Sequence, residues 1–92
     1  MNVSQLKARL QQEGFSQNTY SIDGPLPPHE GLILTNVGKT WKIEHFERGV
    51  RRELESFNNE EEACARLYEL LTTHFRWAIH HHAEHVTTKQ GG

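Results

Sequence analysis

The chain has 92 residues, enough for one small domain, which excludes a two-domain enzyme or a full dinucleotide-binding fold. Hydrophobic residues make up 35% and charged residues 24%, values typical of a globular domain rather than of a disordered chain. Ten basic residues stand against 12 acidic ones, and this balance argues against a nucleic-acid-binding protein, because such proteins need excess positive charge to neutralise phosphates.

The first segment is predicted to be a helix over about residues 3–13. Either Asn2 or Ser4 can cap its start, and Gly14 stands where a left-handed residue commonly ends a helix. Phe15 follows at once, and we expect it to fold back onto the apolar stripe of the helix. That stripe consists of Val3, Leu6 and Leu10.

Residues 18–22 can form a short strand, with Tyr20 and Ile22 on one side. Three prolines follow within four positions, at Pro25, Pro27 and Pro28. Because proline fixes the backbone and lacks an N–H donor, this stretch excludes a helix or a central strand. We interpret it as a rigid connector rather than as a ligand for another domain.

Three strands are predicted next, at about residues 30–35, 40–47 and 50–57, and their short connections indicate an antiparallel meander. The middle strand alternates strictly between two kinds of side chain. Trp41, Ile43 and His45 share one face, which we assign to the core. Lys42, Glu44 and Phe46 share the other face.

The second helix is predicted to start at Asn58, with Glu61 completing a capping box, and to end near residue 79. Three glutamates in its first turn, residues 60–62, suit the positive end of the helix dipole. Its apolar stripe consists of Ala63, Leu67, Leu70, Leu71 and Phe75.

These elements predict an α+β fold: an antiparallel meander of three or four strands, with an N-terminal and a C-terminal helix packed on one face. Residues 1–86 are expected to form a single domain, followed by a mobile tail at residues 87–92. The predicted core consists of Leu32, Leu34, Trp41, Ile43, Leu54, Leu67, Leu70 and Leu71.

Histidines gather near the C-terminus. His81 and His85 lie one helical turn apart, a spacing that can hold zinc or nickel. The plainer interpretation is a solvated helix end, where imidazoles face the negative pole of the dipole. We therefore predict no metal and no cofactor, and leave open whether the cluster binds metal. Its members are His80, His81, His82 and His85.

Catalytic groups are sparse. The glutamates of the second and third predicted strands could form a carboxylate pair, but a charged sheet face accounts for them better, because so short a chain offers little material for a cleft. Cys64 lies beside the apolar stripe and is predicted to be a buried structural thiol. As the single cysteine, it excludes an intramolecular disulfide and suits a reducing compartment.

No apolar run reaches the roughly 18 residues of a membrane span, and the N-terminus lacks a secretion signal, so we expect a cytoplasmic protein that does not contact membranes.

Four segments together resemble a pattern in small bacterial immunity proteins, which are encoded beside polymorphic toxins, including contact-dependent inhibition toxins. The resemblance covers about residues 5–71 and departs from the pattern at Pro25, at Thr40 and at His45-Phe46. It implies a cytosolic, non-enzymatic protein that binds and neutralises one cognate toxin domain. The segments are Tyr20–Gly24, Gly38–Ile43, Glu47–Gly49 and Phe57–Cys64.

The resemblance also implies that the toxin can be a nuclease with a basic cleft, which an acidic sheet face would fit. The residues expected to contact the toxin are Glu44, Glu53 and Glu55, with Phe46 as an anchor and Glu30 and Glu47 as rim charges. A small adaptor or regulatory domain is the alternative, ahead of a small enzyme or a metal-binding protein. The oligomeric state stays open.

Overall fold

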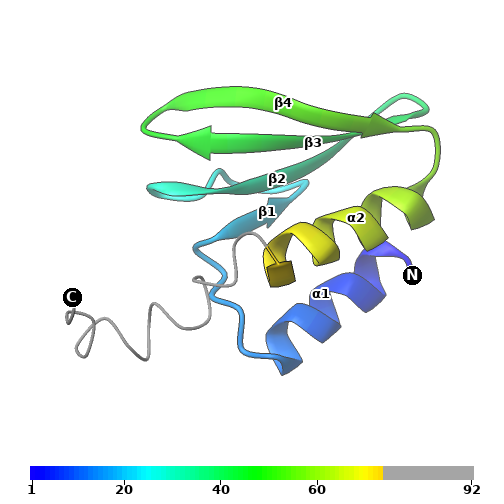
Figure 1. The fold of residues 1–92 in the computed structure, drawn as a ribbon, viewed down its shortest axis with the longest axis horizontal. Coiled ribbons are helices and arrows are strands. Elements are labelled where there is room, and N and C mark those ends of the chain that lie inside the picture. The colour runs from blue at the N-terminus through cyan, green and yellow to red at the C-terminus, as the bar shows by residue number, and fades with distance from the viewer. Residues whose placement is uncertain (74–92) are drawn as a thin grey trace.

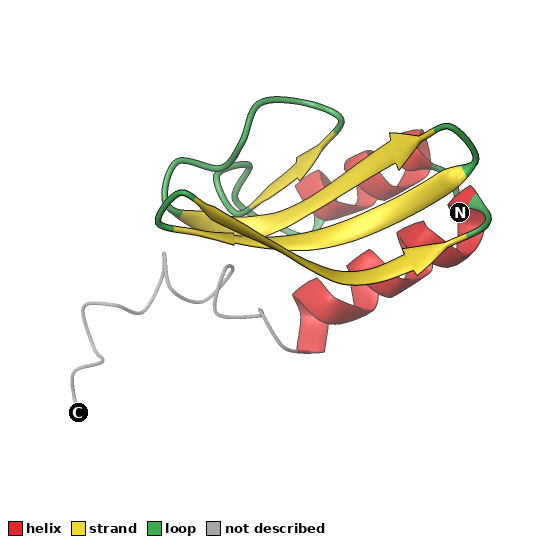
Figure 2. Cartoon of the chain, turned by 90° about the horizontal axis from the view of Figure 1, so that it is seen from above, coloured by secondary structure: helices red, strands yellow, loops and turns green. Residues whose placement is uncertain are grey.

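The computed structural model describes residues 1–73, which form two layers (Figures 1 and 2). One layer is a four-stranded sheet, and the other is a pair of helices that lie on the same face of that sheet. The α+β fold is therefore confirmed, whereas the predicted helical stretch beyond Thr73 and the C-terminal tail lie outside the described residues. The elements in chain order are α1 (Val3–Gln12), β1 (Tyr20–Ile22), β2 (Glu30–Val37), β3 (Thr40–Glu47), β4 (Val50–Phe57) and α2 (Glu60–Thr73).

The strands lie in the order β1-β2-β3-β4, and β2, β3 and β4 form the predicted antiparallel meander. The first strand differs from a simple meander because β1 runs parallel to β2. The proline-rich connector explains this difference. It cannot make a two-residue hairpin, so it carries the chain back across the sheet before β2 begins. Pro27 is buried on this return path.

Both helices start with asparagine caps. The Asn2 side chain accepts a hydrogen bond from the Gln5 backbone N–H, and the Gln5 side chain accepts one from the Asn2 backbone, which completes a capping box. On α2 the cap is Asn59, whose Oδ1 accepts from the Glu62 N–H at 2.8 Å. The predicted cap at Asn58 is therefore wrong by one residue. Neither of the two helices within residues 1–73 has the length and apolar character needed to cross a membrane.

The core lies between the sheet and the helices, and it draws on both helices and on β1, β2 and β3. Phe15 is 4% exposed and belongs to this core, as expected from its position after Gly14, whose φ is +87°. Trp41 is only partly buried and packs against the edge of the cluster. The buried members are Leu6, Leu10, Phe15, Tyr20, Ile22, Leu32, Leu34, Ile43, Ala63, Cys64, Leu67, Leu70 and Leu71.

The predicted core position of Leu54 is wrong, because this side chain is 40% exposed. The pairing of β3 with β4 explains the error. Ile43 pairs with Glu55 and Glu44 pairs with Glu53, so Leu54 is an extra residue in a β-bulge. The bulge breaks the period-two alternation of β4, and Leu54 no longer points to the core face.

Candidate protein-binding surface

The sheet face opposite the helices carries paired charges where β3 and β4 meet. Lys42 Nζ lies 3.6 Å from Glu53 Oε1, and the Arg51 guanidinium binds the Glu44 carboxylate through its Nε at 3.0 Å. The backbone register brings these side chains together, because Glu44 is the partner of Glu53 on the neighbouring strand. We call this set of four side chains the charge ladder: Lys42, Glu44, Arg51 and Glu53.

The charge ladder differs from the acidic face that the sequence suggested. Each of its two glutamates is engaged by a cation, so the surface presents alternating charges of both signs rather than a block of negative charge. The two adjacent strands place the charges of each pair side by side before any partner binds. Such preordered charges favour specificity and orientation in binding more than they favour affinity.

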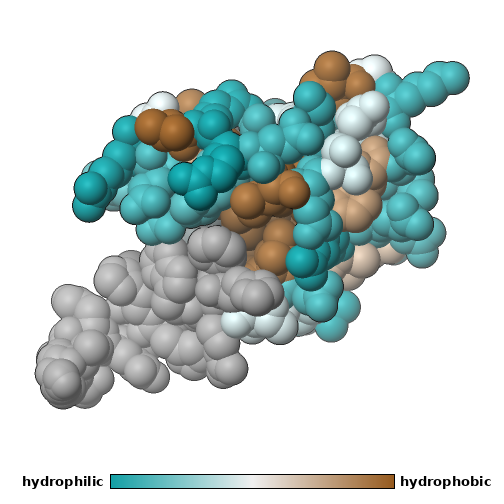
Figure 3. All heavy atoms as spheres, turned by 45° about the horizontal axis from the view of Figure 1, so that its top comes forward, coloured by the Kyte–Doolittle hydropathy of each residue, from teal (hydrophilic) through white to brown (hydrophobic). Residues whose placement is uncertain are grey.

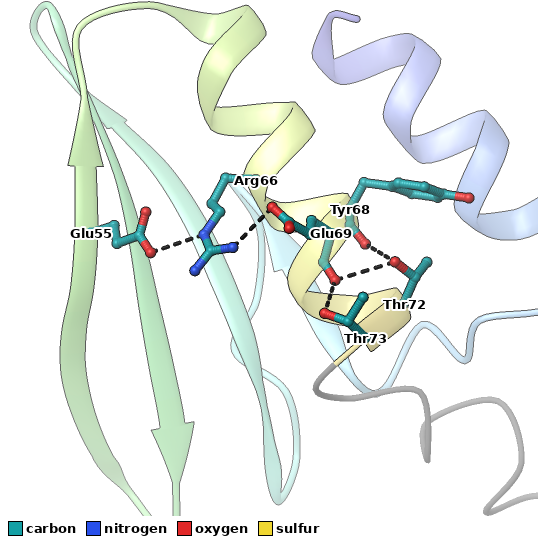
Figure 4. A network of polar contacts seen from close by, with 6 residues as sticks. All are labelled: Glu55, Arg66, Tyr68, Glu69, Thr72 and Thr73. Carbon is teal, nitrogen blue, oxygen red and sulfur yellow. Dashed lines mark hydrogen bonds and ion pairs between the residues drawn. The ribbon is translucent and has the colours of Figure 1, made fainter.

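Glu55, the third acid of the predicted site, points the other way. It is the register partner of Ile43, a core residue, and therefore lies on the helix side of the sheet. Its Oε2 accepts a hydrogen bond from Arg66 Nε at 2.9 Å, and the same guanidinium donates to Glu69 at 2.9 Å (Figure 4). Glu55 thus ties β4 to α2 and does not share a surface with Glu44.

Phe46 lies on the predicted face but is not an exposed anchor, because only 8% of its surface is accessible. Its register partner is Gly31. A Cβ atom placed on Gly31 would lie 2.8 Å from Pro27 Cγ, so the proline-rich connector covers the sheet at this point. Phe46 is therefore a side chain covered by neighbouring parts of the chain, and the predicted exposed anchor at this position is wrong.

Glu30 and Glu47 lie at the end of the sheet near the β3–β4 turn, where they flank His45. Glu30 Oε2 lies 2.8 Å from His45 Nε2, and ligand atoms of all three side chains lie within 4.8 Å of one another. These residues are able to hold a transition-metal ion. His45 and Glu47 line a shallow hollow of about 270 Å³. Arg48 and Arg52 line it as well, and their positive charge opposes the binding of a cation there.

A hollow that the sequence did not indicate runs beside β1, with a volume of about 500 Å³. It lies between α1, which contributes Lys7 and Gln11, and the connector, which contributes Pro25 and Leu26. Ser21 also lines it, and the Ser21 hydroxyl is buried without a hydrogen-bond partner among the described residues. No sequence signal marked this hollow, because it depends on how the connector returns across the sheet.

Cys64 is fully buried, as predicted for a structural thiol. Burial raises the pKa of the thiol, and the nearby Glu60 carboxylate raises it further. Both effects keep the side chain in its unreactive, protonated form at neutral pH. The thiol therefore has neither the exposure nor the thiolate character of a catalytic nucleophile.

The chain was compared with protein-family models, with curated proteins and with solved structures, and none of these matches it.

Proposed function

We propose that this chain is an immunity protein that acts in the cytoplasm, where it binds and neutralises a cognate bacterial toxin domain by direct contact. It catalyses no reaction of its own. The segmental resemblance to immunity proteins motivates the proposal, and the charge ladder is the observation that carries it. A toxin that binds the ladder would present charges of both signs, arranged to meet each of the four side chains.

The ladder also explains how recognition can be specific. Its side chains come from two adjacent strands, so hydrogen-bonded backbone fixes their spacing before any partner arrives. Preorganisation reduces the entropy that is lost on binding. A nuclease domain remains a suitable toxin, provided that its contact surface carries acidic as well as basic groups.

The experiment inverts the ladder without changing the net charge. The variant K42E/E44R/R51E/E53K keeps both ion pairs but exchanges the sign at every position. We expect it to fold as the wild type does and to lose protection when it is co-expressed with the toxin encoded beside its gene. Close charge pairs in interfaces couple by about 1.5–7 kcal/mol, so Kd for the isolated toxin domain should rise by more than about tenfold.

The matched control is K39E/E62K, which also conserves net charge and changes two exposed residues outside the ladder. This control should protect cells as the wild type does. Full protection by a folded ladder variant would assign the contact to another surface while leaving the function in place. If the wild type itself neither binds nor protects against the neighbouring toxin, the immunity function is wrong.

A further inference from the structure

β4 forms one edge of the sheet, and within residues 1–73 no strand pairs with its outer side. It pairs with β3 alone among the described strands, whereas β1, at the opposite edge, is only three residues long. An eight-residue edge strand presents a row of unpaired N–H and C=O groups, which is a template for another strand. Figure 3 turns the β4 side of Figure 1 toward the viewer and shows hydrophilic atoms with hydrophobic groups among them, so a partner strand must match both charge and apolar surface.

The charges of β4 follow an order that suits a second copy of the same strand. Arg51 and Arg52 lie in its first half, and Glu53 and Glu55 lie in its second half. An antiparallel copy reverses this order, so the basic half of each strand faces the acidic half of the other. A parallel copy would place like charges side by side, which is unfavourable.

In one antiparallel register, Arg52 of one copy lies opposite Glu55 of the other. The β-bulge allows this register, because it places both side chains on the same face of the sheet. Arg52 pairs with His45 and Glu55 pairs with Ile43 on β3, so both side chains point toward the helix side. Residues that face each other across two antiparallel strands must share a face. In a strand without a bulge, positions 52 and 55 would point to opposite faces, but the extra residue brings them to the same one.

The same register also brings apolar side chains together. Val50 pairs with Glu47 and Phe57 pairs with Trp41, so both lie on the helix side like Arg52 and Glu55. Val50 is 62% exposed in the single chain and would lose contact with water beside Phe57 of a second copy. Two-fold symmetry doubles each contact.

We propose that the protein forms a symmetric dimer through antiparallel pairing of β4 with β4 of a second copy. The two-fold axis passes between Glu53 and Leu54, and the two sheets join into one. Arg52 of each copy binds Glu55 of the other. Glu55 can take this second partner because Arg66 engages its Oε2, which leaves Oε1 to accept from Arg52.

Analytical ultracentrifugation of the full chain over a range of micromolar concentrations tests this proposal. The wild type should reach a dimer. Arg52→Glu places two glutamates opposite each other at both ends of the interface, and Glu55→Arg places two arginines there. Each single variant should therefore raise the dimer dissociation constant by about tenfold or more. Lys39→Glu, which makes the same charge change as Arg52→Glu on an exposed residue outside β4, should dimerise as the wild type does.

An equimolar mixture of the two single variants gives the decisive measurement. In the mixed pair, the side chain introduced by Arg52→Glu faces the one introduced by Glu55→Arg, and the unchanged Glu55 and Arg52 face each other at the other end. Opposite charges then meet at both ends, and association should return to the wild-type level. Circular dichroism first confirms that Glu55→Arg, which also loses its bond to Arg66, remains folded. A wild type that is monomeric throughout, single variants that dimerise like the wild type, or folded variants whose mixture stays monomeric would each overturn the proposal.

Discussion

At the scale of single residues, burial separates side chains that look alike in the sequence. Leu54 and Leu67 are both leucines in predicted apolar positions, yet Leu67 is fully buried and Leu54 is 40% exposed. Phe46 shows the same point, because it is buried by a segment that is distant from it in the sequence. Stability measurements on single variants should follow these differences.

Leu67→Ala should lower the free energy of unfolding by about 2–5 kcal/mol, because it leaves a cavity beneath the sheet. Leu54→Ala should lower it by no more than about 1 kcal/mol, because the bulged side chain is 40% exposed and its removal leaves no closed cavity. Urea denaturation followed by circular dichroism measures both values. Equal losses in the two variants would contradict the bulge.

Phe46→Ala should also destabilise the protein, by about 3 kcal/mol, since the ring is covered by the connector. An exposed interface anchor would behave differently: its removal would leave stability unchanged and weaken binding alone. Urea denaturation of this variant, with toxin binding measured separately on the folded fraction, distinguishes the two roles.

Burial of Cys64 predicts that the stability of the fold depends on pH and that the thiol reacts slowly. The raised pKa means that the folded chain holds the thiol proton more tightly than the unfolded chain does. The stabilisation is therefore complete below the ordinary thiol pKa of about 8.5 and is lost as pH rises through the folded value. Iodoacetamide should label Cys64 slowly at pH 8 in the native protein and rapidly in urea; rapid native labelling would contradict the burial.

At the scale of elements, two contacts fix how the segments meet. The connector and the residue before β1 both pack onto β2 at Gly31, where an added Cβ would lie 2.8 Å from Pro27 Cγ and 2.4 Å from the Thr19 carbonyl oxygen. On the other side of the sheet the two helices are joined by a polar contact. Tyr68 of α2 donates to Glu13 at the end of α1 at 2.7 Å, and the Arg9 guanidinium lies 4.4 Å from the centre of the tyrosine ring.

Gly31→Ala should lower the free energy of unfolding by about 1–3 kcal/mol, because backbone and proline atoms leave no room for a methyl group. Gly24→Ala, in the connector that packs against Gly31, is the matched control, since its added Cβ would meet its nearest neighbours at an ordinary 3.8 Å. Thermal unfolding of both variants makes the comparison. If the two substitutions had the same effect, the close approach at Gly31 would be wrong.

The hydrogen bond from Tyr68 lowers the pKa of the Glu13 carboxyl, with a further contribution from Arg9. Tyr68→Phe should therefore raise this pKa toward its ordinary value, which an NMR pH titration measures. A lowered pKa adds stability above the ordinary carboxyl pKa, and this stability is lost as pH falls through the folded value. The variant should accordingly lose less stability on acidification than the wild type; an unchanged Glu13 titration would mean that the helices do not meet there.

At the scale of the whole molecule, a single core joins the sheet to both helices, so residues 1–73 are expected to unfold together. Leu6→Ala in α1 and Leu34→Ala in β2 should shift one common transition to lower denaturant concentration. Helix content followed by circular dichroism and the amide NMR signals of β2 should report the same midpoint in each variant. Separate midpoints would show that α1 unfolds independently.

Much of the element order was determined by the sequence alone. Local signals sufficed for α1, β3, the tight turns and the start of α2 to within one residue, because capping, glycine conformation and alternation act between near neighbours. The core side of β3 was also predictable, since Trp41 and Ile43 alternate onto one face of the strand while charged residues alternate onto the other.

Tertiary structure decided the composition of the candidate surface. Phe46 is covered because the connector packs over the neighbouring Gly31. Glu55 does not lie on the same sheet face as Glu44 and Glu53, because the bulge at Leu54 changes which face the later side chains of β4 point to. The charge of the surface likewise depends on strand register, which places Glu44 opposite Glu53 and leaves Arg51 and Lys42 close enough to form ion pairs with them. Alternation along one strand cannot reveal such effects, because cover, register and charge pairing all depend on segments that meet only in the folded chain.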